Sequence, residues 1–270
     1  MTRIDGPVCL TIAGLDPSGG AGVVADVKTF RAFDCYPTAA VTSITFQNTT
    51  GVLGADHQSA TSVRRQLESI VDDLDIAAVK TGMLPTSEII GSVAAIVDER
   101  QLKNLVVDPV IRSTSGYELV DKNALRMLVD MLLPLATLVT PNIPETEALT
   151  GIAIETEEDI RDAAVILRGM GVKNVLIKGG HLSSAQWTMD NAQLRAVDHL
   201  FIRDEHQTFS SEYIETTATH GTGCVLSSAI AANLALGKTL PQAVAAAKEF
   251  VTNAIRTAPK LGHGHSPISV

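Results

Sequence analysis

The sequence predicts an α/β fold of three layers, in which helices cover both faces of a mostly parallel central sheet. Two observations predict it. Short apolar runs typical of buried strands alternate with longer amphipathic stretches typical of helices almost throughout the 270 residues, and repeated βα units of this kind form parallel sheets. Polar and glycine residues also recur directly after the strand-like runs. We expect one domain over residues 1–270, because no linker, repeat or low-complexity segment interrupts the pattern.

Six segments have the length and composition of buried parallel strands. Each is dominated by aliphatic residues. Five are followed by glycine, proline or a polar residue, and 105–110 stops at Asp108-Pro109, which are the usual strand boundaries. In chain order they are 8–13, 39–46, 77–80, 105–110, 138–140 and 175–178. Residues 185–215 are polar and lack a helical period, so we expect them to form a pair of antiparallel strands at a sheet edge.

Helices are predicted between these strands from apolar residues that recur with a period near 3.6. A capping-box pattern begins one of them at Thr156-x-x-Asp159, and Gly171 ends it. The helix before it ends at Pro134, and the last one begins at Thr239-Leu240-Pro241. In order, the expected helices are 21–33, 61–74, 88–100, 125–133, 156–170, 225–236 and 239–257.

Composition excludes several classes of function. The net charge is −9 and no stretch is basic, which argues against nucleic-acid binding. The three cysteines lack paired spacing, so neither a disulfide framework nor a zinc site is indicated. No apolar segment reaches 18 residues and the N-terminal apolar run is short. We therefore expect a cytoplasmic protein with no membrane partner.

The segment Thr219-His220-Gly221-Thr222-Gly223-Cys224 stands at the start of an apolar helix. Gly221 and Gly223 permit a tight turn that exposes backbone amides, and these amides with the helix dipole form an anion site. Cys224 in that field should have a lowered pKa and could act as a base or nucleophile. The alternative is a glycine turn followed by a buried cysteine.

Polar residues follow the predicted strands at 14–20, 47–48, 80–83, Asp108, 142–145 and 178–181. The carboxyl ends of parallel strands meet at one sheet edge, where ligands bind. Asn142-x-x-Glu145 suits hydrated Mg²⁺ and equally an N-cap with a first-turn acid. Lys178 could contact a phosphate or reach solvent.

Other patterns favour plain structural interpretations. Residues 14–22 lack the spacing of a dinucleotide-binding loop, and no acidic residue ends the second strand, which disfavours a nicotinamide-dependent oxidoreductase. From its pattern alone, Asp26 is best interpreted as a solvated helix residue. The histidines lack metal-ligand spacing, and 262–265 is expected to be a flexible loop.

Taken in order, the motifs resemble the hydroxymethylpyrimidine/phosphomethylpyrimidine kinase family of the ribokinase-like superfamily. The resemblance covers nearly the whole chain. The matching motifs are AGLDPSGGAG (13–22), ADVKTF (25–30), QNTTGV (47–52), KTGML (80–84), DPV (108–110), TPNIPE (140–145), KGGHL (178–182), HGTGC (220–224) and GHGHSP (262–267). The chain departs from the family pattern at Leu15, Thr114 and Ser266.

The resemblance implies a ribokinase-like fold and a role for each matching residue. Substrate contacts would come from Gln47, Asp26, Gly14, Met83 and Val110. Cys224 would lie beside the reacting oxygen, with the anion hole at Gly221, Thr222 and Gly223. ATP phosphates would be bound by Lys178, Asp108 and Thr222, and Asn142 and Glu145 would hold Mg²⁺ through water. The resemblance also implies a homodimer.

The implied reaction is ATP-dependent phosphorylation of 4-amino-5-hydroxymethyl-2-methylpyrimidine and then of its monophosphate, for thiamine diphosphate biosynthesis. A pyridoxal kinase of the same fold is the alternative. Gln47 disfavours it, because pyridoxal-preferring relatives tend to have Met there and an amide can both donate and accept hydrogen bonds. A non-catalytic ligand-binding domain is a further alternative. If Cys224 is a base, Cys224→Ala should harm the first phosphorylation more than the second.

Overall fold

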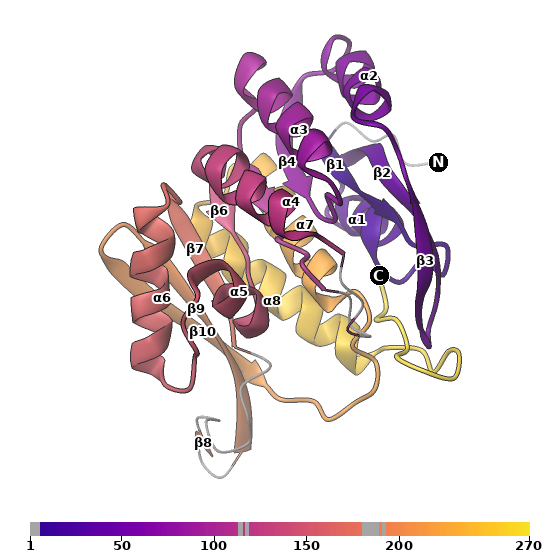
Figure 1. Ribbon diagram of the computed structural model, residues 1–270. Coiled ribbons are helices and arrows are strands. Elements are labelled where there is room, and N and C mark those ends of the chain that lie inside the picture. The colour runs from indigo at the N-terminus through magenta and orange to yellow at the C-terminus, as the bar shows by residue number, and fades with distance from the viewer. Residues whose placement is uncertain (1–5, 113–115, 117–118, 180–188, 191–192) are drawn as a thin grey trace.

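The computed structural model describes residues 6–112, 116, 119–179, 189–190 and 193–270 (Figure 1). Its sheet has the strand order β10-β9-β7-β6-β5-β4-β1-β2-β3, and β8 pairs with β9. The strands are β1 Val8–Leu15, β2 Tyr36–Asn48, β3 Gly51–His57, β4 Ile76–Thr81, β5 Leu105–Val107, β6 Leu138–Val139, β7 Asn174–Lys178, β8 Met189–Asp190, β9 Gln193–Ile202 and β10 Glu205–Glu212. The six strands from β7 to β2 run parallel, whereas β3, β9 and β10 pair antiparallel at the two ends of the sheet.

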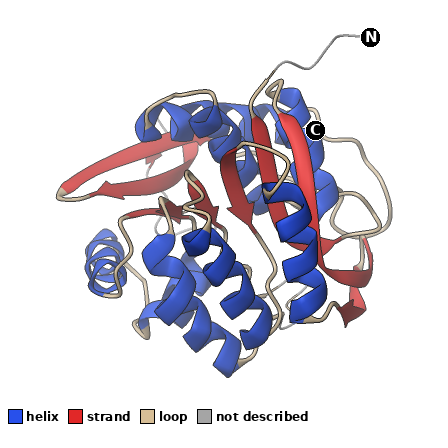
Figure 2. Cartoon of the chain, turned by 90° about the horizontal axis from the view of Figure 1, so that it is seen from above, coloured by secondary structure: helices blue, strands red, loops and turns tan. Residues whose placement is uncertain are grey.

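Helices cover both faces of this sheet (Figures 1 and 2). The helices are α1 Gly22–Ala32, α2 Ala60–Val71, α3 Ser87–Glu99, α4 Lys122–Met127, α5 Ile143–Thr150, α6 Glu157–Gly169, α7 Thr222–Ala235 and α8 Leu240–Arg256. One apolar core joins the sheet to α2 through α6, and a second joins it to α1, α7 and α8. The predicted three-layer α/β architecture is confirmed.

Alternation along the strands explains why there are two cores. In β5, Leu105 and Val107 belong to the core beneath α2 through α6, whereas Val106 belongs to the core beneath α7. Successive side chains of a strand point to opposite faces, so a strand covered on both faces is apolar throughout. By the same alternation, Lys80 of β4 points to the face of Ala78, which packs in the core of α1 and α7.

Several boundaries differ from those expected. The strand predicted at 105–110 ends at Val107, because Pro109 has no amide hydrogen to pair. The helix predicted at 125–133 begins earlier, and a π-helical turn, Leu128–Leu132, and a 3₁₀ turn around Pro134 complete it. Strand β3 and the helical extent of α5 were not predicted from the sequence. The antiparallel strand pair at the sheet edge is confirmed for β9 and β10.

The C-terminal loop at 262–265 is held by hydrogen bonds to the β2–β3 turn, although the sequence predicted a flexible loop. The backbone amides of His263 and His265 donate to Thr49 Oγ1 and O, at 3.2 and 2.7 Å. Ser266 is buried, and its hydroxyl accepts from the Leu261 amide and donates to the Pro259 carbonyl. This loop therefore ties the β2–β3 turn to the end of the chain. Among the described residues, no helix is long and apolar enough to cross a membrane.

Candidate active site

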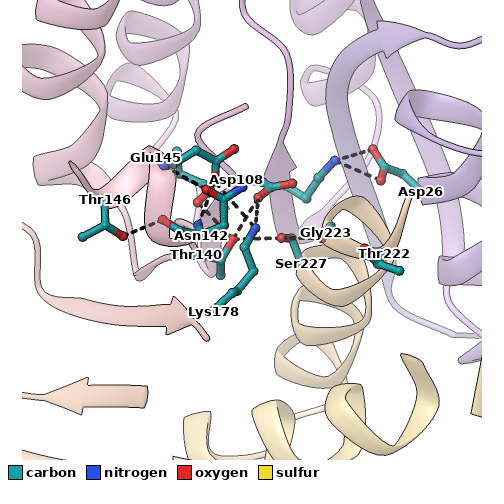
Figure 3. A network of polar contacts seen from close by, with 12 residues as sticks. Asp26, Asp108, Thr140, Asn142, Glu145, Thr146, Lys178, Thr222, Gly223 and Ser227 are labelled. Carbon is teal, nitrogen blue, oxygen red and sulfur yellow. Dashed lines mark hydrogen bonds and ion pairs between the residues drawn. The ribbon is translucent and has the colours of Figure 1, made fainter. Parts of the chain in front are cut away.

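The predicted strand-end residues meet at one edge of the sheet, next to the start of α7. This edge collects Gly14 of β1, Gln47 of β2, Met83 after β4, Asp108 after β5, Asn142 after β6 and Lys178 of β7. Thr114 and His181 lie outside the described residues. Figure 3 shows the side chains around Lys178.

Lys178 lies between two carboxylates (Figure 3). Its Nζ donates to Asp108 Oδ1 at 2.9 Å and lies 3.8 Å from Glu145 Oε2. Thr140 Oγ1 lies 3.3 Å from Asp108 Oδ1 and 2.8 Å from Ser227 Oγ, which links this group to α7. We call Lys178, Asp108 and Glu145 the Lys178 cluster.

The Lys178 cluster contains one more negative group than positive groups. Burial, aided by Asp108, raises the pKa of Glu145 to about 7, although Lys178 and the amides of Asn142 and Ile111 oppose the shift. Burial alone would lower the pKa of Lys178, but Asp108 and Glu145 outweigh it and raise that pKa. An added cation would relieve the repulsion between the two carboxylates.

Asn142 and Glu145 form a capping box at the start of α5. The Glu145 amide donates to Asn142 Oδ1 at 2.8 Å, and the Asn142 amide donates to Glu145 Oε2 at 2.8 Å. The capping interpretation is therefore confirmed, while the metal role stays a prediction. No group of three or more His, Cys, Asp or Glu in the described part of the chain could hold a metal ion. The oxygen donors present fit Mg²⁺, which takes few carboxylates and retains waters.

The start of α7 borders the Lys178 cluster. Gly223 lies next to the Lys178 side chain, because a Cβ on this glycine would be 3.3 Å from Lys178 Nζ. Gly221 has φ +84°, and a Cβ there would lie 1.8 Å from the Gly20 carbonyl oxygen, so only glycine fits. Thr222 Oγ1 donates to the Thr219 carbonyl at 3.1 Å. No described side chain caps the helix start, which agrees with an anion site there.

Cys224 does not have the expected lowered pKa. Burial raises the pKa of the thiol to about 11, and the Asp26 and Asp108 carboxylates add to the shift. Lys80 and the Gly22 amide oppose this shift but do not overcome it. The lowered pKa was expected from the helix field alone, whereas the fold also desolvates the thiol and brings two carboxylates near it. The thiol is therefore neutral at neutral pH.

Asp26 is fully buried, so its interpretation as a solvated helix residue is wrong. Its carboxylate accepts from Lys80 Nζ at 2.8 and 2.9 Å, from Thr11 Oγ1 at 2.6 Å and from Ser228 Oγ at 2.7 Å. Lys80 is also fully buried. We call Lys80, Asp26, Thr11 and Ser228 the Lys80 cluster. Its contacts favour a supporting role for Asp26, and the implied substrate contact stays a prediction.

Three of the residues expected to contact substrate, Gly14, Met83 and Gln47, lie near the ends of β1 and β2. A Cβ on Gly14 would lie 3.1 Å from Met83 Sδ, so these two residues are neighbours. The Gln47 amide lies 3.2 Å from Thr45 Oγ1 and 3.3 Å from His220 Nε2. Val110 is half-buried in the turn after Asp108-Pro109.

Three residues of this region, Lys80, Asp16 and His220, lie in motifs that the sequence singled out, but they were given no role of their own. A lysine inside an apolar strand was the available signal for Lys80. Asp16, two residues before Ser18, matches an Asx turn, and its Oδ1 accepts from the Ser18 amide at 2.8 Å. His220 lies 2.7 Å from Asp16 Oδ2, a contact between residues 204 positions apart that no local pattern could indicate.

The chain is similar to known proteins along nearly its whole length. A family model described as phosphomethylpyrimidine kinase matches residues 16–269. The hydroxymethylpyrimidine/phosphomethylpyrimidine kinase of Haemophilus influenzae is 43% identical over 96% of this chain and 94% of its own length. The thiamine biosynthesis bifunctional protein ThiED of Geobacter sulfurreducens is 44% identical over 96% of this chain, which spans 51% of that longer protein. The Bacillus subtilis pyridoxal kinase, solved with ADP, is 36% identical with a TM-score of 0.87, covering 98% of this chain and 97% of its own.

Proposed function

Because the chain belongs to the phosphomethylpyrimidine kinase family, we propose that it transfers a phosphoryl group from ATP to 4-amino-5-hydroxymethyl-2-methylpyrimidine and then to the resulting monophosphate. The product is the diphosphate used in thiamine diphosphate biosynthesis. This proposal extends to the chain the activity for which its relatives are named.

The observation that carries the proposal is the position of residues 219–224. On one side of this segment, Gly223 approaches Lys178. On the other side, His220 contacts the Gln47 amide. A phosphate bound at the Lys178 cluster and a pyrimidine bound at Gln47 would therefore flank one short segment, as transfer between them requires.

The reaction depends mainly on positioning and charge. The amides at the start of α7 stabilise negative charge on the transferring phosphoryl group, and Lys178 binds a phosphate of ATP. Glu145 and Asn142 would hold Mg²⁺ through water, and the ion would supply charge neutralisation to the ATP phosphates when bound. Asp108 keeps Lys178 charged and in place.

Cys224 contributes by position in this proposal. A neutral thiol cannot take a proton efficiently at neutral pH, and the raised pKa keeps it neutral. The second phosphorylation attacks with a phosphate oxygen and needs no base. Contact between Cys224 and the reacting oxygen is a role that the residue can have in both phosphorylation steps.

A pyridoxal kinase activity is the second candidate, favoured by the likeness to the Bacillus subtilis enzyme. Gln47 favours the aminopyrimidine, because an amide pairs with an amino group and a ring nitrogen together. The Haemophilus influenzae relative named for the pyrimidine reaction is also more similar in sequence, at 43% identity against 36%.

The proposal includes a homodimer. Two large side chains of β2, Ile44 and Phe46, are 43 and 49% exposed, and Leu53 of β3 is 77% exposed. Apolar surface of this kind favours association with a second copy, which light scattering during gel filtration would test. The expected cytoplasmic location stays a prediction, which cell fractionation would test.

Parallel assays of ADP release with MgATP and the pyrimidine alcohol, its monophosphate or pyridoxal test the proposal. We expect both pyrimidines to be phosphorylated with a higher kcat/KM than pyridoxal. Gln47→Met should lower the pyrimidine values about 10- to 100-fold and leave pyridoxal nearly unchanged. Preference for pyridoxal would favour the second candidate, and tight pyrimidine binding without turnover would favour a non-catalytic protein.

A further inference from the structure

The end of β7 is held against β9, its neighbour in the sheet (Figure 1), at the residue that directly follows Lys178. This residue is Gly179, and its amide donates to Asp198 Oδ1 of β9 at 3.1 Å. Gly179 is buried, and a Cβ there would overlap the Val197 carbonyl oxygen. A glycine is needed where two backbones approach so closely. Asp198 therefore fixes the backbone from which the Lys178 side chain starts.

The strand on the other side of β7 holds Lys178 as well. The Lys178 amide donates to the carbonyl of Pro141, directly after β6, at 2.9 Å. The side chain then reaches Asp108 Oδ1 at 2.9 Å and borders Gly223 at the start of α7. A lysine carries its charge at the end of a flexible stem of four carbons. The position of the ammonium group therefore depends on a backbone that both neighbouring strands fix.

Asp198 is itself held by an ion pair with α8. Lys248 Nζ donates to Asp198 Oδ2 at 2.7 Å, so the two carboxylate oxygens have different partners. The side chains of Asp198 and Lys248 are only 6 and 13% exposed. A carboxylate so far removed from water needs a cation to balance its charge. We call Asp198 and Lys248 the Asp198 pair.

The Asp198 pair faces the same side of the sheet as the Lys178 side chain. Lys178 and Asp198 are directly opposite in the antiparallel ladder of β7 and β9, and opposed side chains share a face. Leu176 and Leu200, two residues away on each strand, pack in the core beneath α7 and α8. The Asp198 carboxylate is therefore on the same side of the sheet as the proposed phosphate site.

The charge of Lys248 matters for an anionic ligand at this site. The Lys178 cluster already has one more carboxylate than cation. An unpaired Asp198 carboxylate on the same face would repel a phosphate further, because charges removed from water are weakly screened. Lys248 offsets this negative charge. Asp198 can then accept from the Gly179 amide without opposing ATP.

We propose that Asp198 and Lys248 are positioning residues for Lys178: Asp198 fixes the backbone amide beside it, and Lys248 cancels the carboxylate charge that would otherwise repel the ATP phosphates. Both residues act through Lys178 and through charge rather than by touching the substrate. This inference rests on the proposed function for the identity of the phosphate ligand. The anchoring of β7 is a property of the free protein.

Amide hydrogen exchange at Gly179, followed by NMR of the ligand-free, ¹⁵N-labelled protein, tests the anchoring without reference to activity. Asp198→Ala removes the acceptor, so Gly179 should exchange about tenfold faster, measured against the amides of β1, which report global opening. Asp198→Asn retains an acceptor oxygen and should exchange as slowly as the wild type. Exchange in Asp198→Ala as slow as in the wild type would overturn the anchoring role.

Calorimetric titration with MgATP alone, with kcat for the pyrimidine alcohol measured in parallel, tests the charge role. Lys248→Met should raise the Kd for MgATP about tenfold and leave kcat within about twofold of the wild type, because a uniform binding interaction is weakened. Lys248→Arg and the double variant Lys248→Met/Asp198→Asn should each recover most of the affinity. The exposed control Lys238→Met should bind MgATP like the wild type.

Asp198→Asn alone gives the opposite sign and does not leave a buried carboxylate unpaired. It retains the Lys248 charge, so the Kd for MgATP should fall about two- to fivefold. A Kd above that of the wild type in Asp198→Asn, or a loss in Lys248→Met that neither rescue variant reverses, would overturn the charge role. Absence of pyrimidine turnover in a wild type that binds MgATP would refute the proposed function instead, and the exchange and binding results would stand.

Discussion

Two lysine–aspartate pairs adjoin α7, and they differ in charge balance (Asp26, Asp108 and Lys178 are labelled in Figure 3). Consecutive serines of the helix contact them: Ser228 donates to Asp26 of the Lys80 cluster, and Ser227 contacts the Lys178 cluster through Thr140. In the Lys80 cluster one cation meets one carboxylate, and both side chains have no exposed surface. In the Lys178 cluster one cation meets two carboxylates, and Lys178 is 12% exposed.

This difference in charge balance indicates that the Lys80 cluster is a structural ion pair, whereas the Lys178 cluster is suited to binding a ligand. The Asp26 carboxylate receives hydrogen bonds from three side chains, which satisfies a buried charge. Glu145 remains a buried acid whose ionisation is opposed. Because such a group opposes folding once it is charged, its presence at the sheet edge is explained by binding a cation or a cation-bound phosphate.

The largest effect is expected from breaking the Lys80 cluster. Lys80→Met leaves Asp26 buried without a cation, which should lower the free energy of unfolding by about 3–5 kcal/mol. Urea unfolding at pH 7 measures this change. The double variant Lys80→Met/Asp26→Leu is the matched control and should recover much of the loss, because no unpaired charge remains. A single variant as stable as the wild type would contradict the structural role.

The fold was predictable to a greater extent than either cluster. Alternating strands and helices are local patterns, so the central strands and most helices were found. The turn from β2 to β3 lacked a sequence signal strong enough to reveal the second strand. The pairing of Lys80 with Asp26 joins residues 54 positions apart, and helical periodicity could not show that Asp26 faces the sheet.

The next largest effect is expected from Glu145→Gln. Glutamine retains the capping-box geometry and removes the buried acid, so the variant should be more stable than the wild type by about 1–2 kcal/mol at pH 8. Urea unfolding at pH 8 and pH 4.5 measures the difference at each pH. Glu158→Gln, in an exposed position of α6, is the control and should show no such pH-dependent gain.

The direction of this pH dependence follows from the pKa of Glu145, which is raised from its ordinary 4.5 to about 7 in the folded chain. Below pH 4.5 the group is protonated in both the folded and unfolded chains, and its destabilising charge is absent. As pH rises from 4.5 to 7 the unfolded chain ionises first, so stability is lost. The advantage of Glu145→Gln should therefore grow over this range. A constant advantage would contradict the assigned pKa.

The smallest effect is expected at Cys224. Because the pKa of the thiol is about 11, Cys224→Ser should change both phosphorylation rates by only a few fold, with a ratio to the wild type that stays constant from pH 6 to 9. This expectation replaces the larger loss in the first step that a thiolate base would cause. A wild-type rate that rises about tenfold per pH unit, with no rise in Cys224→Ser, would restore the base role.

The candidate site could be located from the sequence, but its electrostatics could not. Residues after parallel strands had to meet at one edge, which brought Asp108, Asn142 and Lys178 together as expected. The helix dipole suggested a thiolate at Cys224, whereas burial and two carboxylates from distant segments dominate. Protonation states depend on such three-dimensional surroundings.

The most direct test of the ligand-site interpretation is the rate of ADP release from MgATP with the pyrimidine monophosphate, measured for the wild type and Glu145→Gln at pH 8. We predict that the wild type forms the diphosphate and that the more stable Glu145→Gln variant is slower by about 10- to 100-fold. A Glu145→Gln variant that works at the wild-type rate would contradict the conclusion that the Lys178 cluster retains its second carboxylate for function.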